Sequence, residues 1–368
     1  MLFRSRGDYG NSQVRDETMI PGNDVSEYSR LRIRAGKNDI SNPFLIDEVG
    51  RRLYHDMGWV QPTGTINTLY VNGSFKGMYN TTERLRSQTF QIHYRTINDF
   101  DVNYIDSFVD GDAIFWNQMQ TSLNTLSASP TLTNYQAAQN YLDAVNVADC
   151  FLFWIYVNMD DWPGNNWAAQ RERTPGGVYR MATWDMEAAF GRFGKAVNYD
   201  TININLINGS STCGDIFKRL YRSPEFKLLV ADRIQRHFFN GGVLDDRGAG
   251  SHFQQLINSF TAQVQPLLTY IDNQTVDLGW YNAHINSTTG RRAFLFGGGT
   301  GSFQQTQLWP ATVPPVFSQL GGVVPAGYQL TITMSAPAGA VIYSRSMGPI
   351  RACPAAASRQ ARSPTAAR

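Results

Sequence analysis

A chain of 368 residues, 42% of them hydrophobic, is long enough for one large domain or two ordinary ones and can fill a hydrophobic core. Its net charge is only +2 and its basic residues are scattered, which argues against a concentrated basic surface for nucleic acid. The most apolar stretch, Cys150 to Val157, is too short to span a bilayer. The three cysteines have no metal-ligand spacing, so they indicate neither a zinc site nor a disulfide framework.

The first part of the chain alternates between strand and helix patterns. Ser29 to Arg34 predicts a strand, and Pro43 to Asp56 predicts a helix that begins at proline and carries its apolar residues largely on one face. Thr65 to Val71 and Met78 to Thr82 then predict a β-hairpin, because the glycines between them, Gly73 included, supply the positive φ angles of a turn.

Helical periodicity dominates the rest of the chain as far as residue 296. We predict five helices there, over the following ranges: Asp112 to Leu126, Asn134 to Asn158, Asp215 to Phe239, Gly250 to Asp272 and Asp277 to Phe296. The second of them is apolar almost all round toward its end, which is typical of a helix buried in a large core. A second hairpin is predicted after it, from Trp167 to Arg173 and from Val178 to Trp184.

The composition changes at Gly297 to Gly, Thr, Pro and Val with short alternating strands. We therefore predict a main domain over residues 1–298, a linker over 299–315 and a partial β module over 316–345, with strands at Tyr328 to Met334 and Ala340 to Tyr343. Residues 346–368 form an Ala, Arg, Ser and Pro tail without periodicity, which predicts disorder.

Two acidic segments bracket the second hairpin and form the candidate site. Asp161 and Asn166 lie before it and Asp185 follows it, and a strand pair returns its two ends to the same place. Carboxylates that lie close together repel unless a cation sits between them, so the arrangement predicts a divalent metal, Mg²⁺ or Mn²⁺. In phosphoryl transfer, one Asp orients the acceptor hydroxyl, an Asn five residues later binds metal and a second Asp holds metal against the phosphates.

A structural interpretation of the same residues stays open. Asp-Trp-Pro-Gly-Asn-Asn is also a good turn, in which Asp160 or Asp161 simply accepts backbone N–H groups. Asp161 is preferred over Asp160 because only Asp161 has Asn at the kinase-like offset. Glu83, at the end of a strand, could pair with a phosphate-anchoring lysine or be a surface charge. Lys76 is interpreted as part of a solvated turn.

Six blocks of the sequence, taken in order, resemble the spore-coat-protein-H (CotH) kinase family. They cover roughly residues 1–298 and are 31–39 (LRIRAGKND), 45–47, 69–84 (LYVNGSFKGMYNTTER), 161–166, 184–191 (WDMEAAFG) and 239–244. The resemblance implies an α+β, divergent protein-kinase-like fold with a helix-rich C-terminal part, followed here by an incomplete β-sandwich module. It also implies transfer of phosphate from ATP to Ser or Thr of coat proteins.

Carried onto this chain, the resemblance implies a role for each candidate residue. Asp161 would be the catalytic aspartate, Asp185 the metal-binding aspartate and Asn166 a second metal ligand. Glu187 stands where the family usually has Asp two residues after the metal aspartate, so it would be a metal ligand with a longer side chain. Glu83, Asn166 and Asp185 would together hold ATP and its metal.

A phosphate-anchoring lysine is missing from the expected place. The chain has only five lysines, and neither Lys37 nor Lys76 sits convincingly on an N-terminal strand. We therefore expect the kinase-like domain to be N-terminally incomplete, with that lysine and a signal peptide lost, which would make the protein extracellular or attached to the cell surface or spore coat. Residues 347–357 can be encoded by reading the expected Asp-Gly-Ser-Asp-Pro-Arg continuation out of register, so we also expect a frameshifted tail.

Three functions compete at this point. The first is an ATP- and Mg²⁺-dependent kinase acting on a protein with Ser or Thr acceptors. The second is a non-catalytic surface or coat protein that uses the kinase-like fold as a binding scaffold and its β module to contact polysaccharide. The third is a metal-dependent phosphohydrolase, which ranks lowest because the sequence shows no third metal-binding block.

Overall fold

The computed structural model describes residues 2–4, 10–35, 45–297, 301–310, 315–319 and 323–333. The chain divides into two compact units, Met1–Ala311 and Thr312–Arg368, and each is described by itself. Helices and small, separate sheets occur in the first unit, so the α+β prediction is confirmed. None of the described helices combines the length and the apolar character that crossing a membrane requires.

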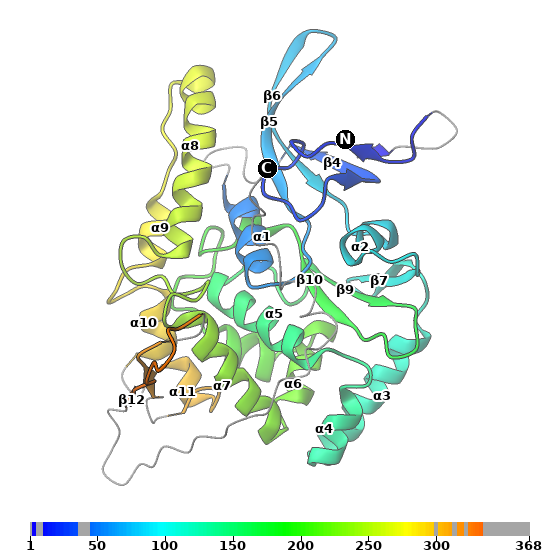
Figure 1. Ribbon diagram of the computed structural model, residues 1–368, viewed down its shortest axis with the longest axis vertical. Coiled ribbons are helices and arrows are strands. Elements are labelled where there is room, and N and C mark those ends of the chain that lie inside the picture. Colours follow the sequence, from blue (N-terminus) through cyan, green and yellow to red (C-terminus); the bar gives the residue numbers. More distant parts are fainter. Residues whose placement is uncertain are drawn as a thin grey trace. The chain divides into compact units, whose positions relative to one another are not determined.

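The N-terminal sheet has four antiparallel strands in the order β1-β4-β6-β5. Their bounds are β1 Leu2–Arg4, β4 Arg30–Arg34, β5 Gly64–Val71 and β6 Ser74–Glu83. The first predicted hairpin is confirmed and is longer than expected, because Asn72 and Gly73 alone form the turn, with φ angles of 50° and 78°. The hairpin projects beyond the rest of the sheet at the top of Figure 1.

Helix α1 (Ile46–Asp56) connects this sheet to the rest of the first unit. It confirms the predicted helix as far as it can be compared, since Pro43 and Phe44 lie outside the described residues. Every residue from Ile46 to His55 is buried, and the helix packs against segments from the middle and end of the domain. It meets β5 closely at Gly64, where a Cβ atom would lie 2.9 Å from Glu48 Oε2 on the helix and 2.5 Å from the Thr81 carbonyl oxygen on β6, so only glycine fits there.

The second sheet has the order β10-β9-β7-β8 and is also antiparallel. Its strands are β7 Phe100–Tyr104, β8 Ser107–Asp110, β9 Trp167–Glu172 and β10 Arg180–Thr183. The predicted hairpin of β9 and β10 is confirmed. Strands β7 and β8 and the short helix α2 (Ser87–Tyr94) that precedes them were not predicted.

The first unit also contains a short antiparallel pair of β2 (Val14–Arg15) and β3 (Glu27–Tyr28), and helices dominate the rest of it (Figure 1). Their bounds are α3 Ile114–Ala128, α4 Leu132–Ala138, α5 Ala144–Val157, α6 Thr212–Leu220, α7 Pro224–Phe238, α8 His252–Asp272, α9 Gly279–His284, α10 Arg291–Phe296 and α11 Ser302–Gln305, with a π-helical segment η3 at Ile202–Ile207. Helix α5 is buried along its whole length and contacts α7, α1 and β10, as its apolar sequence predicts.

Three of the predicted ranges were wrong as single helices, because each contains two helices. In each range, one residue marks the start of the second helix. The range from Asn134 to Asn158 contains α4 and α5, since the Asp143 side chain accepts a hydrogen bond from the Asn146 backbone N–H at 3.0 Å and caps α5. The range from Asp215 to Phe239 divides at Ser223, which caps α7 in the same way, with Pro224 as the first helical residue.

The third interruption lies between α9 and α10. At Gly290 a Cβ atom would lie 2.4 Å from the backbone oxygens of His284 and Asn286, so the chain turns there in a path open only to glycine. The predicted range from Asp277 to Phe296 therefore also contains two helices.

The described part of the second unit holds one short antiparallel pair. Strand β11 (Val316–Phe317) pairs with β12 (Ile332–Thr333), so the predicted strand from Tyr328 is shorter than expected among the described residues. The predicted strand at Ala340 to Tyr343 and the tail at 346–368 lie outside the described residues.

Candidate active site

The hairpin of β9 and β10 brings Asp161, Asn166 and Asp185 together. Thr183 pairs with Trp167 at the end of the hairpin, so the segments before β9 and after β10 meet. The Asn166 side-chain nitrogen donates to Asp161 Oδ2 at 2.8 Å and contacts the Asp185 backbone oxygen at 3.4 Å. The spatial cluster predicted from the strand pairing is present.

Two members of this cluster have an unusual backbone conformation. Asn166 and Asp185 have φ angles of 62° and 57°, in the left-handed region that residues with a side chain rarely adopt. Asp185 stands at the start of the short helix η2 (Met186–Ala188). Asn and Asp adopt this region more readily than other residues with a side chain, so the conformation fixes the path of the backbone at the site without by itself indicating a function.

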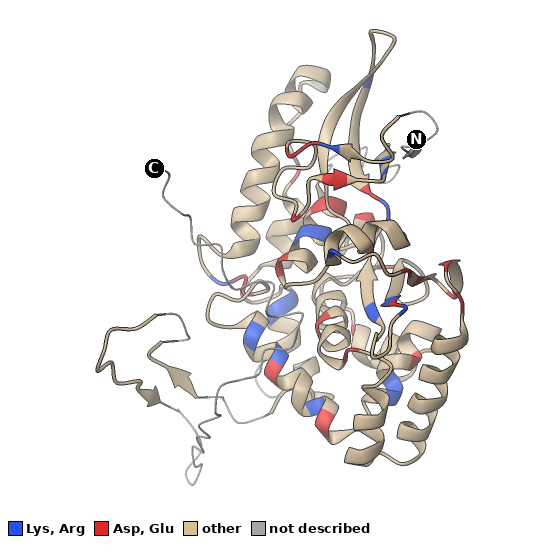
Figure 2. Cartoon of the chain, turned by 45° about the vertical axis from the view of Figure 1, so that its right-hand side comes forward, with Lys and Arg blue, Asp and Glu red and all other residues tan. Residues whose placement is uncertain are grey.

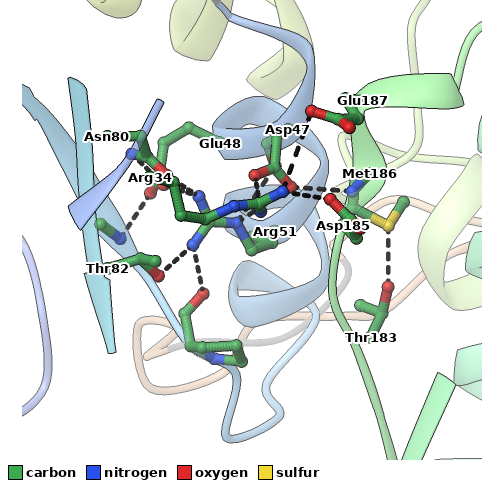
Figure 3. Close-up of polar contacts among 12 residues, drawn as sticks. Arg34, Asp47, Glu48, Arg51, Asn80, Thr82, Thr183, Asp185, Met186 and Glu187 are labelled. Carbon is green, nitrogen blue, oxygen red and sulfur yellow. Dashed lines mark hydrogen bonds and ion pairs between the residues drawn. The ribbon is translucent and has the colours of Figure 1, made fainter. Parts of the chain in front are cut away.

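A guanidinium group connects the N-terminal sheet to this cluster (Figure 3). Arg34, the last residue of β4, donates to Asp47 on α1 and to Asp185, and its nitrogen Nη2 lies 3.8 Å from Glu187 Oε2. Burial opposes the charge on Arg34, but Asp47 and Asp185 outweigh it and raise the pKa of Arg34. Three carboxylates therefore share one cation, whose side chain is 14% exposed.

Helix α1 holds the other end of this arrangement. Asp47 accepts a hydrogen bond from the Met186 backbone N–H at 2.8 Å and lies 3.3 Å from Arg51 Nε. Burial would raise the pKa of Asp47, but the guanidiniums of Arg51 and Arg34 lower it below its usual value. Asp47 stays ionised, so it fixes the position of Arg34 and of the segment that follows Asp185.

Asp161 has a different environment. Its carboxyl group contacts the Asn166 amide, and desolvation raises the pKa of Asp161 while that hydrogen bond opposes the rise. The neighbouring Asp160 is engaged through its backbone, since its N–H donates to the Ala188 oxygen at 3.1 Å. Asp161 is exposed. A solvent-facing carboxyl group with a raised pKa is suited to accept a proton from a bound hydroxyl.

Glu83 lies at the end of β6, where its side chain is buried. It accepts from His93 Nε2 at 2.9 Å and from the Asn23 side chain at 3.0 Å. Burial opposes protonation of His93, but Glu83 outweighs it and raises the pKa of His93. The structure thus pairs Glu83 with a histidine and an amide instead of a lysine. Lys37, the other lysine considered from the sequence, lies outside the described residues.

Three residues present oxygen atoms for a metal ion at this place. The carboxylates of Asp185 and Glu187 and the amide oxygen of Asn166 are the hard donors that Mg²⁺ and Mn²⁺ prefer. Among the described residues, no group of three or more His, Cys, Asp or Glu is arranged to hold a metal ion. The cation that the structure places against Asp185 is Arg34.

A small pocket of about 20 Å³ opens beside Arg34, between β4, β6 and the start of the segment that carries Asp185. It is lined by Arg32, Arg34, Arg51, Pro62, Thr82, Glu83, Arg84, Leu85, Tyr104 and Trp184. Among the described residues the buried Arg84 Nε atom has no hydrogen-bond partner, and the Arg32 guanidinium lies 5.6 Å from the centre of the Trp184 ring. The pocket has room for about one water molecule, and the arginines around it concentrate positive charge there.

Sequence reasoning missed these arginines. Arg34 is 151 positions from Asp185, so no local spacing connects them, and arginine is the commonest charged residue of the chain. A signal was nevertheless present: Arg32 and Arg34 are two residues apart on a predicted strand, which places them on the same face of the sheet.

The cluster of two aspartates and one asparagine beside arginines is the kind of site that phosphoryl transfer uses. In agreement with this, the family model described as CotH kinase protein matches residues 15–289. The chain belongs to this family, and the resemblance seen in the sequence is confirmed. No curated protein matches the chain.

Proposed function

We propose that the protein transfers the γ-phosphate of ATP to Ser or Thr residues of a coat or surface protein, with a divalent metal ion as cofactor. The observation that carries this proposal is the position of Arg34. One guanidinium contacts a carboxylate on the helix after its strand, Asp47, and the aspartate after the hairpin, Asp185. Protein kinases require the same three parts together: a strand cation, a helix carboxylate and a metal-binding aspartate.

In this proposal, the arginines supply the positive charge that anchors the phosphates, a role that the sequence analysis assigned to a lysine. Arg32, Arg34 and Arg84 line one pocket, and their guanidiniums gather positive charge there, although both Nη atoms of Arg34 already contact Asp47 and Asp185. Arg84 supports this assignment most directly, because its buried Nε atom has no hydrogen-bond partner among the described residues. An anionic ligand would supply that partner.

Asp161 acts on the acceptor. Its carboxylate receives the proton of the Ser or Thr hydroxyl, the hydroxyl oxygen forms a bond to the γ-phosphorus, and the bond from that phosphorus to the bridging oxygen breaks to release ADP. Asn166 holds the carboxylate in place through its amide nitrogen. The raised pKa of Asp161 favours proton acceptance.

Asp185, Asn166 and Glu187 would hold the metal ion. A bound Mg²⁺ or Mn²⁺ ion supplies positive charge that offsets the charge developing on the phosphates. Asp185 is held in its unusual backbone conformation by the segment that Asp47 anchors, so its carboxylate is directed before any ligand arrives.

The test is phosphate transfer by the full chain. Purified protein with γ-labelled ATP and Mg²⁺ or Mn²⁺ should label itself or a generic Ser/Thr substrate such as casein. Asp161→Asn and Asp185→Asn should each abolish labelling, whereas Asp160→Asn, a matched change at the adjacent residue, should leave most of it. If wild type binds ATP and transfers no phosphate, the scaffold alternative replaces this proposal.

We also propose that the protein works outside the cell or on the cell surface or spore coat, as the resemblance to kinases that act on coat proteins implies. Fractionation of the source cells with an antibody against the chain tests this location. Recovery in the cytosolic fraction alone would contradict it.

A further inference from the structure

Lys195 is a buried lysine in the segment that follows Phe190 and Gly191, and the proposed reaction does not use it. Its residue is 7% exposed. Its ammonium nitrogen donates to the Met159 backbone oxygen at 2.7 Å and to the Trp162 backbone oxygen at 3.0 Å. These two oxygens stand on either side of Asp160 and Asp161, so one ammonium spans the loop that carries the proposed catalytic residue.

The segment around Lys195 also lies along this loop through neutral contacts. The Asn158 side chain donates to the Ala196 oxygen at 2.8 Å, and the Asp160 backbone N–H donates to the Ala188 oxygen. Gly194 allows a close approach, since a Cβ atom there would lie 3.2 Å from Asp160 Oδ1. The two segments are therefore packed together along their length, and Lys195 supplies the charged contact between them.

The surroundings explain why a cation is tolerated at this place. Burial lowers the pKa of Lys195 to about 8, and the nearby carboxylates of Asp160 and Asp161 oppose that fall. A buried ammonium is unfavourable unless it is hydrogen-bonded, and here backbone oxygens and nearby carboxylates compensate for the lost water. The Tyr199 ring, 5.1 Å from the ammonium nitrogen, covers another side of it.

We infer that Lys195 is a positioning residue, which ties the segment after Gly191 to the carbonyl groups of Met159 and Trp162 and so fixes Asp161 in its reactive place. This inference rests on the proposed phosphoryl transfer for its effect on rate. Lys195 does not itself bind phosphate, because its nitrogen is buried and directed at backbone oxygens. Small displacements of a reacting group cost large factors in rate, so the contact matters for turnover more than for ATP binding.

The first test compares Lys195→Met with Lys218→Met in the full chain. Lys218 is an exposed lysine with one long contact, 3.4 Å to the Gly209 oxygen, so the same change there is a matched control. Lys195→Met should lower kcat about 10- to 100-fold while KM for ATP changes less than about threefold. Lys195→Arg, which keeps donors for both carbonyl groups, should restore much of the rate.

The second test needs no activity. Amide hydrogen exchange across residues 157–166 should be faster in Lys195→Met than in wild type, and unchanged in Lys218→Met. If wild type transfers no phosphate, the proposed function fails, yet faster exchange would still support the contact and unchanged exchange would overturn it. If Lys195→Met does not fold, Lys195→Arg tests the inference instead. A wild-type-like kcat and wild-type-like hydrogen exchange in that variant support the inference, whereas a kcat as low as that of an Asp161→Asn variant overturns it.

Discussion

At the scale of single residues, the two aspartates of the site differ in the groups that their carboxylates contact. Asp185 contacts the Arg34 guanidinium, whereas the Asp161 carboxylate accepts a hydrogen bond from the neutral amide of Asn166 and the residue is exposed. Identical side chains thereby acquire different tasks, one directed at a cation and the other at a proton. The difference arises from β4 and the hairpin, which bring unlike neighbours to each carboxylate.

Removal of the Arg34 cation should be costly. Arg34→Met leaves Asp47 buried with one of its two guanidinium partners gone, and breaking a buried pair in this way costs about 3 kcal/mol or more of unfolding free energy. Arg34→Lys should recover much of that stability, because a charge remains, but should raise KM for ATP, because lysine cannot bridge two carboxylates and a phosphate. Urea unfolding and ATP kinetics measure the two effects.

The matched control is Arg15, whose side chain is 74% exposed beside Glu27. Arg15→Met should change stability by less than about 0.5 kcal/mol. Equal stability of the Arg15→Met and Arg34→Met variants would contradict the importance given to the buried cation.

Substitution of His284 should have the opposite effect to substitution of Arg34, because it should increase the stability of the protein. His284 is fully buried, neither ring nitrogen has a hydrogen-bond partner among the residues that the structure describes, and burial lowers its pKa to about 3. The ring packs edge-on against Tyr156 and Phe190, at centroid distances of 4.7 and 5.0 Å. Replacing an unsatisfied polar ring by an apolar one removes a desolvation cost, so His284→Phe should stabilise the protein by about 1 kcal/mol. A fall in Tm would show that the site has no room for the larger ring.

At the scale of elements, helix α1 is the centre of the arrangement. Its buried Glu48 accepts from the Gly64 backbone N–H at 2.8 Å and pairs with Arg51 and Arg52, at 2.6 and 3.1 Å. These contacts join the helix to β5 of the N-terminal sheet, while Asp47 on the same helix reaches the segment after Asp185. One helix therefore sets the distance between the arginine pocket and the aspartates.

The C-terminal end of α1 predicts a pH dependence of stability. Burial opposes the charge on His55, but its hydrogen bonds to Asp24 and Asp56 raise its pKa to about 9. A histidine whose pKa is higher in the folded state stabilises the protein fully below its unfolded pKa of about 6.5 and loses that contribution as the pH rises through about 9. Wild type should therefore lose about 1 to 3 kcal/mol of stability between pH 6 and pH 9.5 through this group.

His55→Gln isolates the effect. The difference in unfolding free energy between wild type and this variant should be largest near pH 6 and small at pH 9.5. Chemical unfolding at both pH values measures it. A difference that does not depend on pH would mean that the His55 contacts do not require the charge.

The sequence predicted elements well where short-range chemistry decides them. The β5–β6 turn follows from Asn72-Gly73, and the proximity of Asp161 and Asp185 follows from the β9–β10 hairpin. The predictions of long helices were wrong where a capping residue starts a new helix although the apolar pattern continues through it, as at Asp143. Strand β7 was missed because its alternation is short and its partner, β9, is distant in sequence.

The candidate site was predictable only in part, for a related reason. Asp161, Asn166 and Asp185 lie within one stretch of chain, so spacing could connect them. Arg34 and Asp47 come from a different sheet and helix, and their approach to Asp185 depends on how α1 packs against η2. Contacts between elements that are distant in the sequence cannot be predicted from residue spacing. The positions of Arg32 and Arg34 on one face of a predicted strand did indicate that arginines could supply the strand cation.

At the scale of the whole molecule, the main hydrophobic core belongs to the first unit. Its described members run from Leu45 to Trp309, and they include the aromatic contacts of Phe238, Phe296 and Phe303 near the end of that range. The last helix, α11, and the residues just after it are thus part of the core and not a linker. The boundary predicted at residue 298 lies earlier than the division after Ala311.

Shortening the chain tests this division. A protein that ends at Ala311 keeps every described core residue and should retain its Tm within a few degrees. A protein that ends at Gly297 loses Phe303, Leu308 and Trp309, all buried, and should be destabilised by several kcal/mol. Scanning calorimetry of both compares them. Similar loss in the two proteins would place essential contacts beyond residue 311.

Arg34 gives the candidate site an internal counter-ion, and this has a consequence for ligand binding. Because a guanidinium already balances Asp185, a chelator should leave Tm unchanged. Under the proposed function, a metal ion held by Asp185 would compete with Arg34 for that carboxylate, and Arg34 would then be available to another anion. The phosphates of a nucleotide are such anions, so metal and nucleotide should each raise the affinity of the other by the same factor, a thermodynamic coupling that titration calorimetry can measure in both orders.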